Sequence, residues 1–204
     1  MGEIKATTVY TVSGIMVILA LAIGSIICIL LNPSWDIMVN SFSDLGDTDS
    51  PSRYLFDAVC VIAGIFISIF SIGFLRYGKK LTKVGGGVMI LAGFMMVLVG
   101  IISKEFSYDG HLLVSKVFAF TFAVGAALTC LQDAIDRHWK ELLPAVIGGL
   151  MVAGIWIAYL LLGEENVRYG LAQTVSFAGA FLWFVYANMR AHKLYAEADA
   201  GITA

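Results

Sequence analysis

The chain has 204 residues, of which 59% are hydrophobic and only 14% are charged. Soluble globular domains average about 45–50% apolar and about 25% charged residues, so this chain has too few charges to cover a water-exposed surface. A formal net charge of −2 also excludes the clustered basic surface that a nucleic-acid partner requires. Composition therefore predicts an integral membrane protein whose main partner is the lipid bilayer.

Six apolar segments are long enough to cross a membrane, because a helix needs about 20 residues to span the hydrocarbon layer. They run over residues 9–31, 54–75, 84–103, 112–131, 142–162 and 169–189. The sequence thus predicts an all-α fold, a six-helix transmembrane bundle that forms a single integral-membrane domain over residues 1–204. We expect a multi-pass protein of the cell membrane.

The basic residues of the connecting loops predict the orientation, since cytoplasmic loops carry an excess of Lys and Arg. Nine of the 13 basic residues fall at the end of the bundle that holds the two termini, and four fall at the other end or near it. Both termini are therefore expected in the cytoplasm. The polar stretch 41–57 and the loops 103–111 and 163–169 then face outward.

Small residues at helical spacing predict where the helices touch, because close approach is the main attraction between helices in lipid. Three sets stand out: Gly86, Gly93 and Gly100; Ala145, Gly149 and Ala153; Ala172, Ser176 and Ala180. They suit seams inside the bundle, and the same pattern would also suit a homo-oligomer. The small, polar residues from Ala191 onward are expected to fray.

The stretch SFSDLGDTDSPSRYLFD, residues 41–57, is the longest polar interruption of the chain. Together with the loop before the fourth span it predicts an outward-facing pocket with six candidate ligand-binding residues: Ser43, Asp44, Asp57, Glu105, His111 and Ser115. A structural interpretation stays open beside it. In that case Ser43 and Asp44 cap a turn, Gly46 ends it with a positive φ, and Asp57 is a buried hydrogen-bonding group.

Neighbouring charges have plainer interpretations. Asp47 and Asp49 are expected to be solvated residues of a turn. Lys116 is expected to extend its ammonium toward the interface, and a salt bridge to Asp57 or Glu105 is the alternative.

Asp44, Asp57, Glu105 and His111 are also residue types that hold divalent ions. Their spacing matches no known metal motif, so a divalent metal is a hypothesis and no cofactor is identified. In a reaction, one of the carboxylates or His111 would serve as general base. The residues are compatible with binding and with hydrolysis, and enzymatic activity stays open.

Short motifs in three places resemble a family of polytopic membrane proteins. They are SDLG after the first span, YLFDAVCVIAGI in the second, and LVGIISKEFSYDGH closing the third. This pattern is similar to the uncharacterised, mainly archaeal family catalogued as domain of unknown function 998. The family-type positions are Ser43, Asp44, Leu45, Gly46, Gly64, Gly100, Glu105 and His111. The family's pattern has asparagine at position 57, and Phe-Pro where Ser103 and Lys104 stand. The resemblance implies the fold and an outer polar cluster, and no activity.

Three functions follow from these residues. The first is a membrane protein whose outward pocket binds, and in one version hydrolyses, a lipid headgroup or a small polar ligand. The second is a non-catalytic scaffold or accessory subunit. The third is a transporter of small solutes or ions, which is disfavoured because Asp57 and Lys116, the charges inside the predicted spans, lie near the outer edge and not at the midplane.

Overall fold

The computed structural model describes residues 5–200, which form six α-helices and one short 3-10 helix and contain no strand. The elements are α1 (Ala6–Leu31), η1 (Phe42–Gly46), α2 (Arg53–Tyr77), α3 (Lys80–Ile101), α4 (Tyr108–Ile135), α5 (Trp139–Leu162) and α6 (Tyr169–Asp199). All six α-helices are long and apolar enough to cross a membrane. The predicted all-α, six-helix architecture is therefore confirmed.

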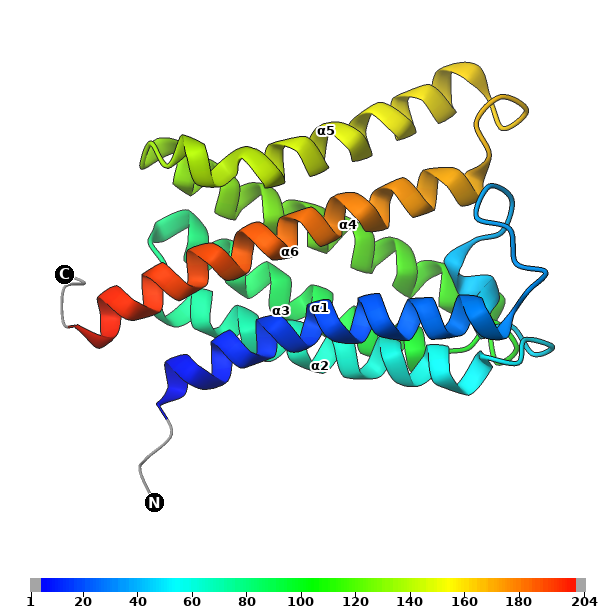
Figure 1. The fold of residues 1–204 in the computed structure, drawn as a ribbon, viewed down its shortest axis with the longest axis horizontal. Helices are drawn as coiled ribbons and strands as arrows, with labels where there is room; N and C mark the ends of the chain where they lie inside the picture. The colour runs from blue at the N-terminus through cyan, green and yellow to red at the C-terminus, as the bar shows by residue number, and fades with distance from the viewer. Residues whose placement is uncertain (1–4, 201–204) are drawn as a thin grey trace.

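Successive helices run up and down the bundle, so α1 begins and α6 ends at the same end, which we call the terminal end (Figure 1). The opposite end, the η1 end, carries η1 and the connections 102–107 and 163–168. Helix α2 packs extensively against α1 and α3, and α3 packs against α4. Helix α5 packs against α6 and barely touches α4, and it lies at the edge of the bundle in Figure 1.

Three glycines of α3 form its contact with α2, as their seven-residue repeat predicts. A Cβ added at Gly86 would lie 2.9 Å from the carbonyl oxygen of Ser71, and one at Gly93 would lie 2.7 Å from that of Gly64. At Gly100 it would lie 2.5 Å from the carbonyl oxygen of Asp57. Because no side chain separates the two backbones, the end of α3 and the loop that follows it are held beside the start of α2.

The prediction for the seam of α5 is wrong at two of its three residues, whereas Ala145 is buried in the core. Gly149 and Ala153 are exposed, and nothing lies within 4 Å of a Cβ added at Gly149. The contact between α5 and α6 runs instead through Gly148 and Gly179, where an added Cβ on Gly148 would lie 2.6 Å from the Gly179 carbonyl oxygen. The rest of α5 carries exposed leucines and isoleucines, as a lipid-facing helix does.

The expected fraying from Ala191 onward is also wrong for the described part of this tail, because α6 continues through Asp199. Residues 201–204 lie outside the described residues. Ala191 and Tyr195 are buried there, at 0% and 2% exposure. The Tyr195 ring lies 6.0 Å from that of Tyr10 in α1 and 5.6 Å from that of Tyr77 at the end of α2. This aromatic contact gives the last turns of α6 a packing partner that the small polar residues around them do not reveal.

Candidate functional site

The site predicted at the η1 end is built on two hydrogen bonds that Ser41, at the start of η1, donates to Asp44. The hydroxyl of Ser41 donates to Oδ1 of Asp44 at 2.6 Å, and the backbone N–H of Ser41 donates to Oδ2 at 2.7 Å. These bonds satisfy the N-terminus of the 3-10 turn as a capping box does. The expectation of a positive φ at Gly46 is wrong. Glycine is needed there because an added Cβ would lie 2.6 Å from the ring of Phe56.

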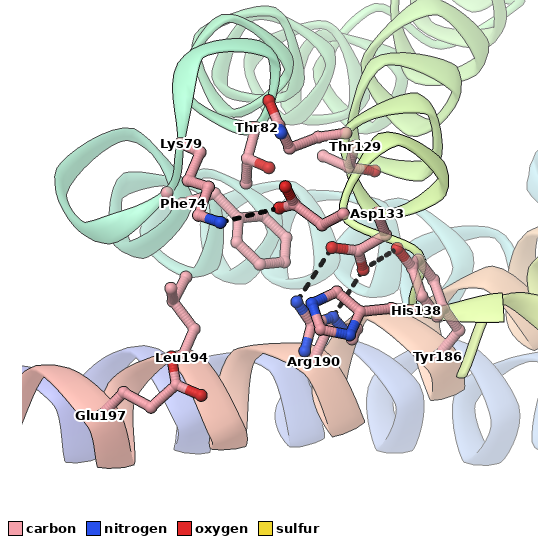
Figure 2. A pocket seen from close by; sticks show the side chains of 13 residues that line it. Phe74, Lys79, Thr82, Thr129, Asp133, His138, Tyr186, Arg190, Leu194 and Glu197 are labelled. Atoms are coloured by element: carbon pink, nitrogen blue, oxygen red, sulfur yellow. Dashed lines mark hydrogen bonds and ion pairs between the residues drawn. The ribbon is translucent and has the colours of Figure 1, made fainter. Parts of the chain in front are cut away.

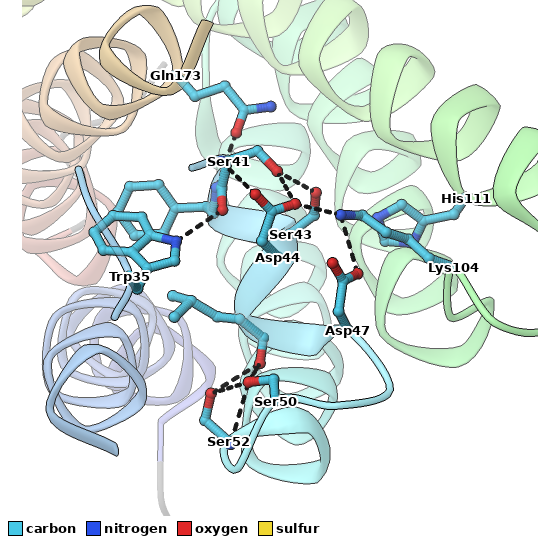
Figure 3. A network of polar contacts seen from close by, with 12 residues as sticks. Trp35, Ser41, Ser43, Asp44, Asp47, Ser50, Ser52, Lys104, His111 and Gln173 are labelled. Carbon is cyan, nitrogen blue, oxygen red and sulfur yellow. Dashed lines mark hydrogen bonds and ion pairs between the residues drawn. The ribbon is translucent and has the colours of Figure 1, made fainter. Parts of the chain in front are cut away.

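Hydrogen bonds from several parts of the chain hold η1 in place. Nε1 of Trp35 donates to the carbonyl oxygen of Ser41 at 3.0 Å, and the N–H of Phe42 donates to Oε1 of Gln173 in α6 at 3.0 Å (Figure 3). The carbonyl oxygen of Leu45 accepts two serine hydroxyls of the following turn at 2.8 Å each. Such anchoring fixes the side chains of η1 before any ligand arrives, which is what a preorganised site requires.

Lys104, between α3 and α4, completes the polar network. Its Nζ lies 2.5 Å from Oδ1 of Asp44 and 3.1 Å from Oδ1 of Asp47 (Figure 3). Asp47 is therefore an ion-pair partner, and its interpretation as a merely solvated turn residue is wrong. Partial burial disfavours the Asp44 carboxylate, but the bonds from Lys104 and Ser41 outweigh it and lower the pKa of Asp44. Burial likewise opposes the ammonium, yet the two carboxylates raise the pKa of Lys104.

His111 approaches the same network from the first turns of α4. The side chain is buried, with 6% exposure, and its Nδ1 lies 2.8 Å from the carbonyl oxygen of Ile102. A carbonyl only accepts, so Nδ1 carries a hydrogen, and in the neutral form of the ring Nε2 presents a lone pair. Nε2 is buried and has no hydrogen-bond partner within residues 5–200. Figure 3 shows the ring pointing from α4 toward Lys104 and Ser43.

Asp57 and Glu105 meet a different cation, Arg53, at the start of α2. The guanidinium of Arg53 forms an ion pair with Glu105, whose side chain is 52% exposed. Asp57 is half-buried and lies within electrostatic reach of Arg53 and His111. Its carboxylate accepts no hydrogen bond from the part of the chain that the structure describes. Glu105 thus turns toward solvent, whereas Asp57 lies on the side of His111.

Two further residues complete the comparison with the sequence. Ser115, one turn beyond His111, is half-buried and forms no side-chain hydrogen bond among the described residues. Lys116 is exposed and has no ion-pair partner in residues 5–200, so the proposed bridge to Asp57 or Glu105 is wrong. Of the predicted set, Asp44 pairs with Lys104, and Ser43 joins the same network through the hydroxyl of Ser41. The ring of His111 points toward this network in Figure 3, and Asp57 lies within electrostatic reach of His111.

A second polar cluster, absent from the sequence predictions, lines a pocket at the terminal end (Figure 2). Asp133 of α4 accepts Nε of Arg190 at 2.5 Å, a second guanidinium nitrogen at 2.9 Å and the hydroxyl of Tyr186 at 2.6 Å. Asp136 lies 3.1 Å from Nζ of Lys79. The cluster ties α4 to α6 and to the connection between α2 and α3.

Asp133, Asp136 and His138 are also the one group among residues 5–200 whose potential metal-ligand atoms lie within 4.8 Å of one another. Both carboxylates of the group already face a cation, the guanidinium of Arg190 for Asp133 and the ammonium of Lys79 for Asp136. A divalent ion would have to enter against these two positive charges. The group is therefore better described as two structural ion pairs than as a metal centre.

Lys104, Arg53 and Asp133 were not predicted from the sequence to belong to polar networks. The role of Lys104 could have been inferred from the sequence, because Lys104 lies beside Glu105 in a loop of otherwise acidic and neutral residues. The role of Asp133 could not, since a carboxylate near a helix end normally faces water. Only the packing of α6 against α4 shows that Asp133 is buried.

The match to known families covers most of the chain. Residues 15–189 match the family described as "Protein of unknown function (DUF998)". The chain belongs to the DUF998 family. The matched region contains η1, Lys104, His111, Asp133 and Tyr186 and ends one residue before Arg190, the cation that pairs with Asp133. No curated protein and no solved structure matches the chain significantly.

Proposed function

We propose that this DUF998 protein binds the polar headgroup of a membrane lipid at the η1 end of its bundle. The observation that carries the proposal is the buried His111. Its ring points toward the network of Ser43, Asp44 and Lys104 in Figure 3, and its Nε2 has no hydrogen-bond partner among residues 5–200. A buried polar group left unpaired costs about 1–3 kcal/mol, and a bound ligand would offset that cost.

The surroundings of His111 support a built site. Its Nδ1 is engaged by the carbonyl oxygen of Ile102, which sets the orientation of the ring. The carboxylate of Asp44 is held by Ser41 and Lys104 together. A polar network whose members are fixed by second partners can present a defined surface to a ligand without reorganising.

The position of the site supports a lipid as the ligand. The network lies where the membrane-spanning helices α2, α3 and α4 begin or end. The ends of such helices lie at the depth of the headgroups, next to the hydrocarbon layer. A headgroup bound at this end of the bundle would therefore lie at the level of His111 while its acyl chains stay in the bilayer. The distribution of Lys and Arg predicts that this leaflet is the outer one.

Substitution of His111 tests the proposal. The side-chain amide nitrogen of asparagine takes about the place of Nδ1, so His111→Asn keeps the donor to Ile102. It removes the Nε2 acceptor and places the amide oxygen near the former position of Cδ2. His192→Asn is the matched control, because His192 is an exposed histidine of α6 at the terminal end. The wild type and both variants are purified in the same detergent, and the lipid that remains bound is quantified by mass spectrometry.

We expect the wild type and His192→Asn to retain lipid equally. His111→Asn should retain about tenfold less, the equivalent of one lost hydrogen bond of about 1.4 kcal/mol. Its thermal midpoint after removal of lipid should match that of the wild type. Equal lipid retention by all three proteins would contradict the proposal, and so would a wild type without bound lipid.

A further inference from the structure

The cations of the η1 site are already occupied by carboxylates of the chain. Lys104 lies against both Asp44 and Asp47, at 2.5 and 3.1 Å, and Arg53 forms its ion pair with Glu105. A phosphate is an acceptor that needs free donors, and it would have to displace a carboxylate from one of these cations. The phosphate of a headgroup is therefore not what this network is arranged to recognise.

The groups that lack hydrogen-bond partners are mainly acceptors. Nε2 of His111 is a buried lone pair, and Oδ1 of Asp47 has no hydrogen-bond partner beyond its ion pair with Lys104. The carboxylate of Asp57 accepts no hydrogen bond from residues 5–200. Against these acceptors the site offers one unpartnered buried donor, Nε of Arg53. A ligand that fits this pattern brings donors.

The charge balance agrees with the hydrogen-bond pattern. Four carboxylates, those of Asp44, Asp47, Asp57 and Glu105, lie near the two cations Lys104 and Arg53, so with the His111 ring neutral the site keeps a negative surplus. Next to a hydrocarbon layer the effective dielectric constant is low, and an unbalanced charge attracts its opposite more strongly than in water. A ligand with positively charged N–H donors would neutralise the negative surplus and also donate hydrogen bonds to the unpartnered acceptors.

We propose that the η1 site selects headgroups that carry a primary ammonium group, which donates to Nε2 of His111 and to the carboxylate of Asp57. This inference rests on the proposed headgroup binding and adds the class of ligand. A primary ammonium has three N–H donors and no acceptor. A quaternary ammonium has the same charge but no N–H, so it can balance the charge while leaving the histidine lone pair unpaired.

The test compares short-chain phosphatidylethanolamine with phosphatidylcholine, which share the phosphate and the positive charge and differ in the N–H donors. Phosphatidylglycerol supplies hydroxyl donors without the positive charge, and free ethanolamine supplies the ammonium without a lipid. Each is titrated into purified wild-type protein, and into Asp57→Asn, His111→Asn and Asp109→Asn. Asp109 is an exposed carboxylate of the same region and serves as the matched control.

The wild type and Asp109→Asn should bind phosphatidylethanolamine about tenfold more tightly than phosphatidylcholine or phosphatidylglycerol. This difference corresponds to the free energy of about one hydrogen bond. In Asp57→Asn and His111→Asn this preference should fall below about threefold. Free ethanolamine should compete with the lipid and bind more weakly, since it lacks the acyl chains. Equal affinity for phosphatidylethanolamine and either other lipid would overturn the ammonium preference while leaving headgroup binding intact. Absence of binding by every lipid would instead overturn the proposed function.

Discussion

Removing the guanidinium of Arg190 tests how strongly the buried ion pair at the terminal end stabilises the bundle. Arg190 makes two charge-assisted hydrogen bonds to Asp133, at 2.5 and 2.9 Å, and the two side chains are 17% and 8% exposed. In Arg190→Met the buried carboxylate would keep only the hydroxyl of Tyr186. Loss of one partner of a buried pair costs about 3–5 kcal/mol.

For a chain of this size 1 kcal/mol corresponds to about 2–4 °C, so the thermal midpoint should fall by roughly 6–20 °C. Thermal unfolding in detergent, followed by circular dichroism, measures this change. The double variant Asp133→Asn/Arg190→Met should recover at least half of the loss, because no unpaired charge remains buried. Lys193→Met is the matched control on the same helix, since its pair with Glu141 is exposed, and it should lose little.

If Arg190→Met were no less stable than Lys193→Met, the buried ion pair would not stabilise the bundle. If the double variant unfolded at the same temperature as Arg190→Met, the loss would not come from the unpaired carboxylate.

Two further predictions concern the α2–α3 seam and the η1 network. Gly93→Ala places a Cβ 2.7 Å from a backbone oxygen of α2 and should lower the free energy of unfolding by about 1–3 kcal/mol. Gly87→Ala is the control, because nothing lies within 4 Å of an added Cβ there, and its stability should not change. Equal thermal midpoints for the two variants would contradict the seam. The lowered pKa of Asp44 means that its contribution to stability is present above the ordinary carboxyl pKa of about 4 and is lost as the pH falls through the folded-state value. The raised pKa of Lys104 means that its contribution is present below about 10.4 and is lost as the pH rises through the folded-state value. Lys104→Met should therefore flatten both limbs of a plot of thermal midpoint against pH, and an unchanged profile would contradict the ion pair.

Much of the fold follows from the sequence, because the bilayer fixes the length of a helix that crosses it. Runs of about 20 apolar residues locate all six helices, and the repeat of Gly86, Gly93 and Gly100 locates the contact of α3 with α2. The seam of α5 was not predictable in the same way. Small residues occur on two faces of that helix, and only the position of α6 decides that Gly148 is in contact and Gly149 is not.

The candidate site is predictable in part. The polar residues of two loops pointed to Asp44 and His111, since such side chains between apolar spans gather at one interface. The role of Lys104 depends on a distance between two loops that are 60 residues apart in sequence, and that distance follows from the packing of α2 against α3. The partnerless Nε2 of His111 depends on a single hydrogen bond to Ile102, which no pattern of residue types encodes.

The most direct test of the central claim is an equilibrium titration of delipidated protein with short-chain phosphatidylethanolamine, run side by side on wild type and His111→Asn. The account predicts saturable, one-site binding to the wild type and about tenfold weaker binding to His111→Asn, with equal thermal midpoints for the two lipid-free proteins. The same affinity in both proteins, or no saturable binding to the wild type, would contradict it.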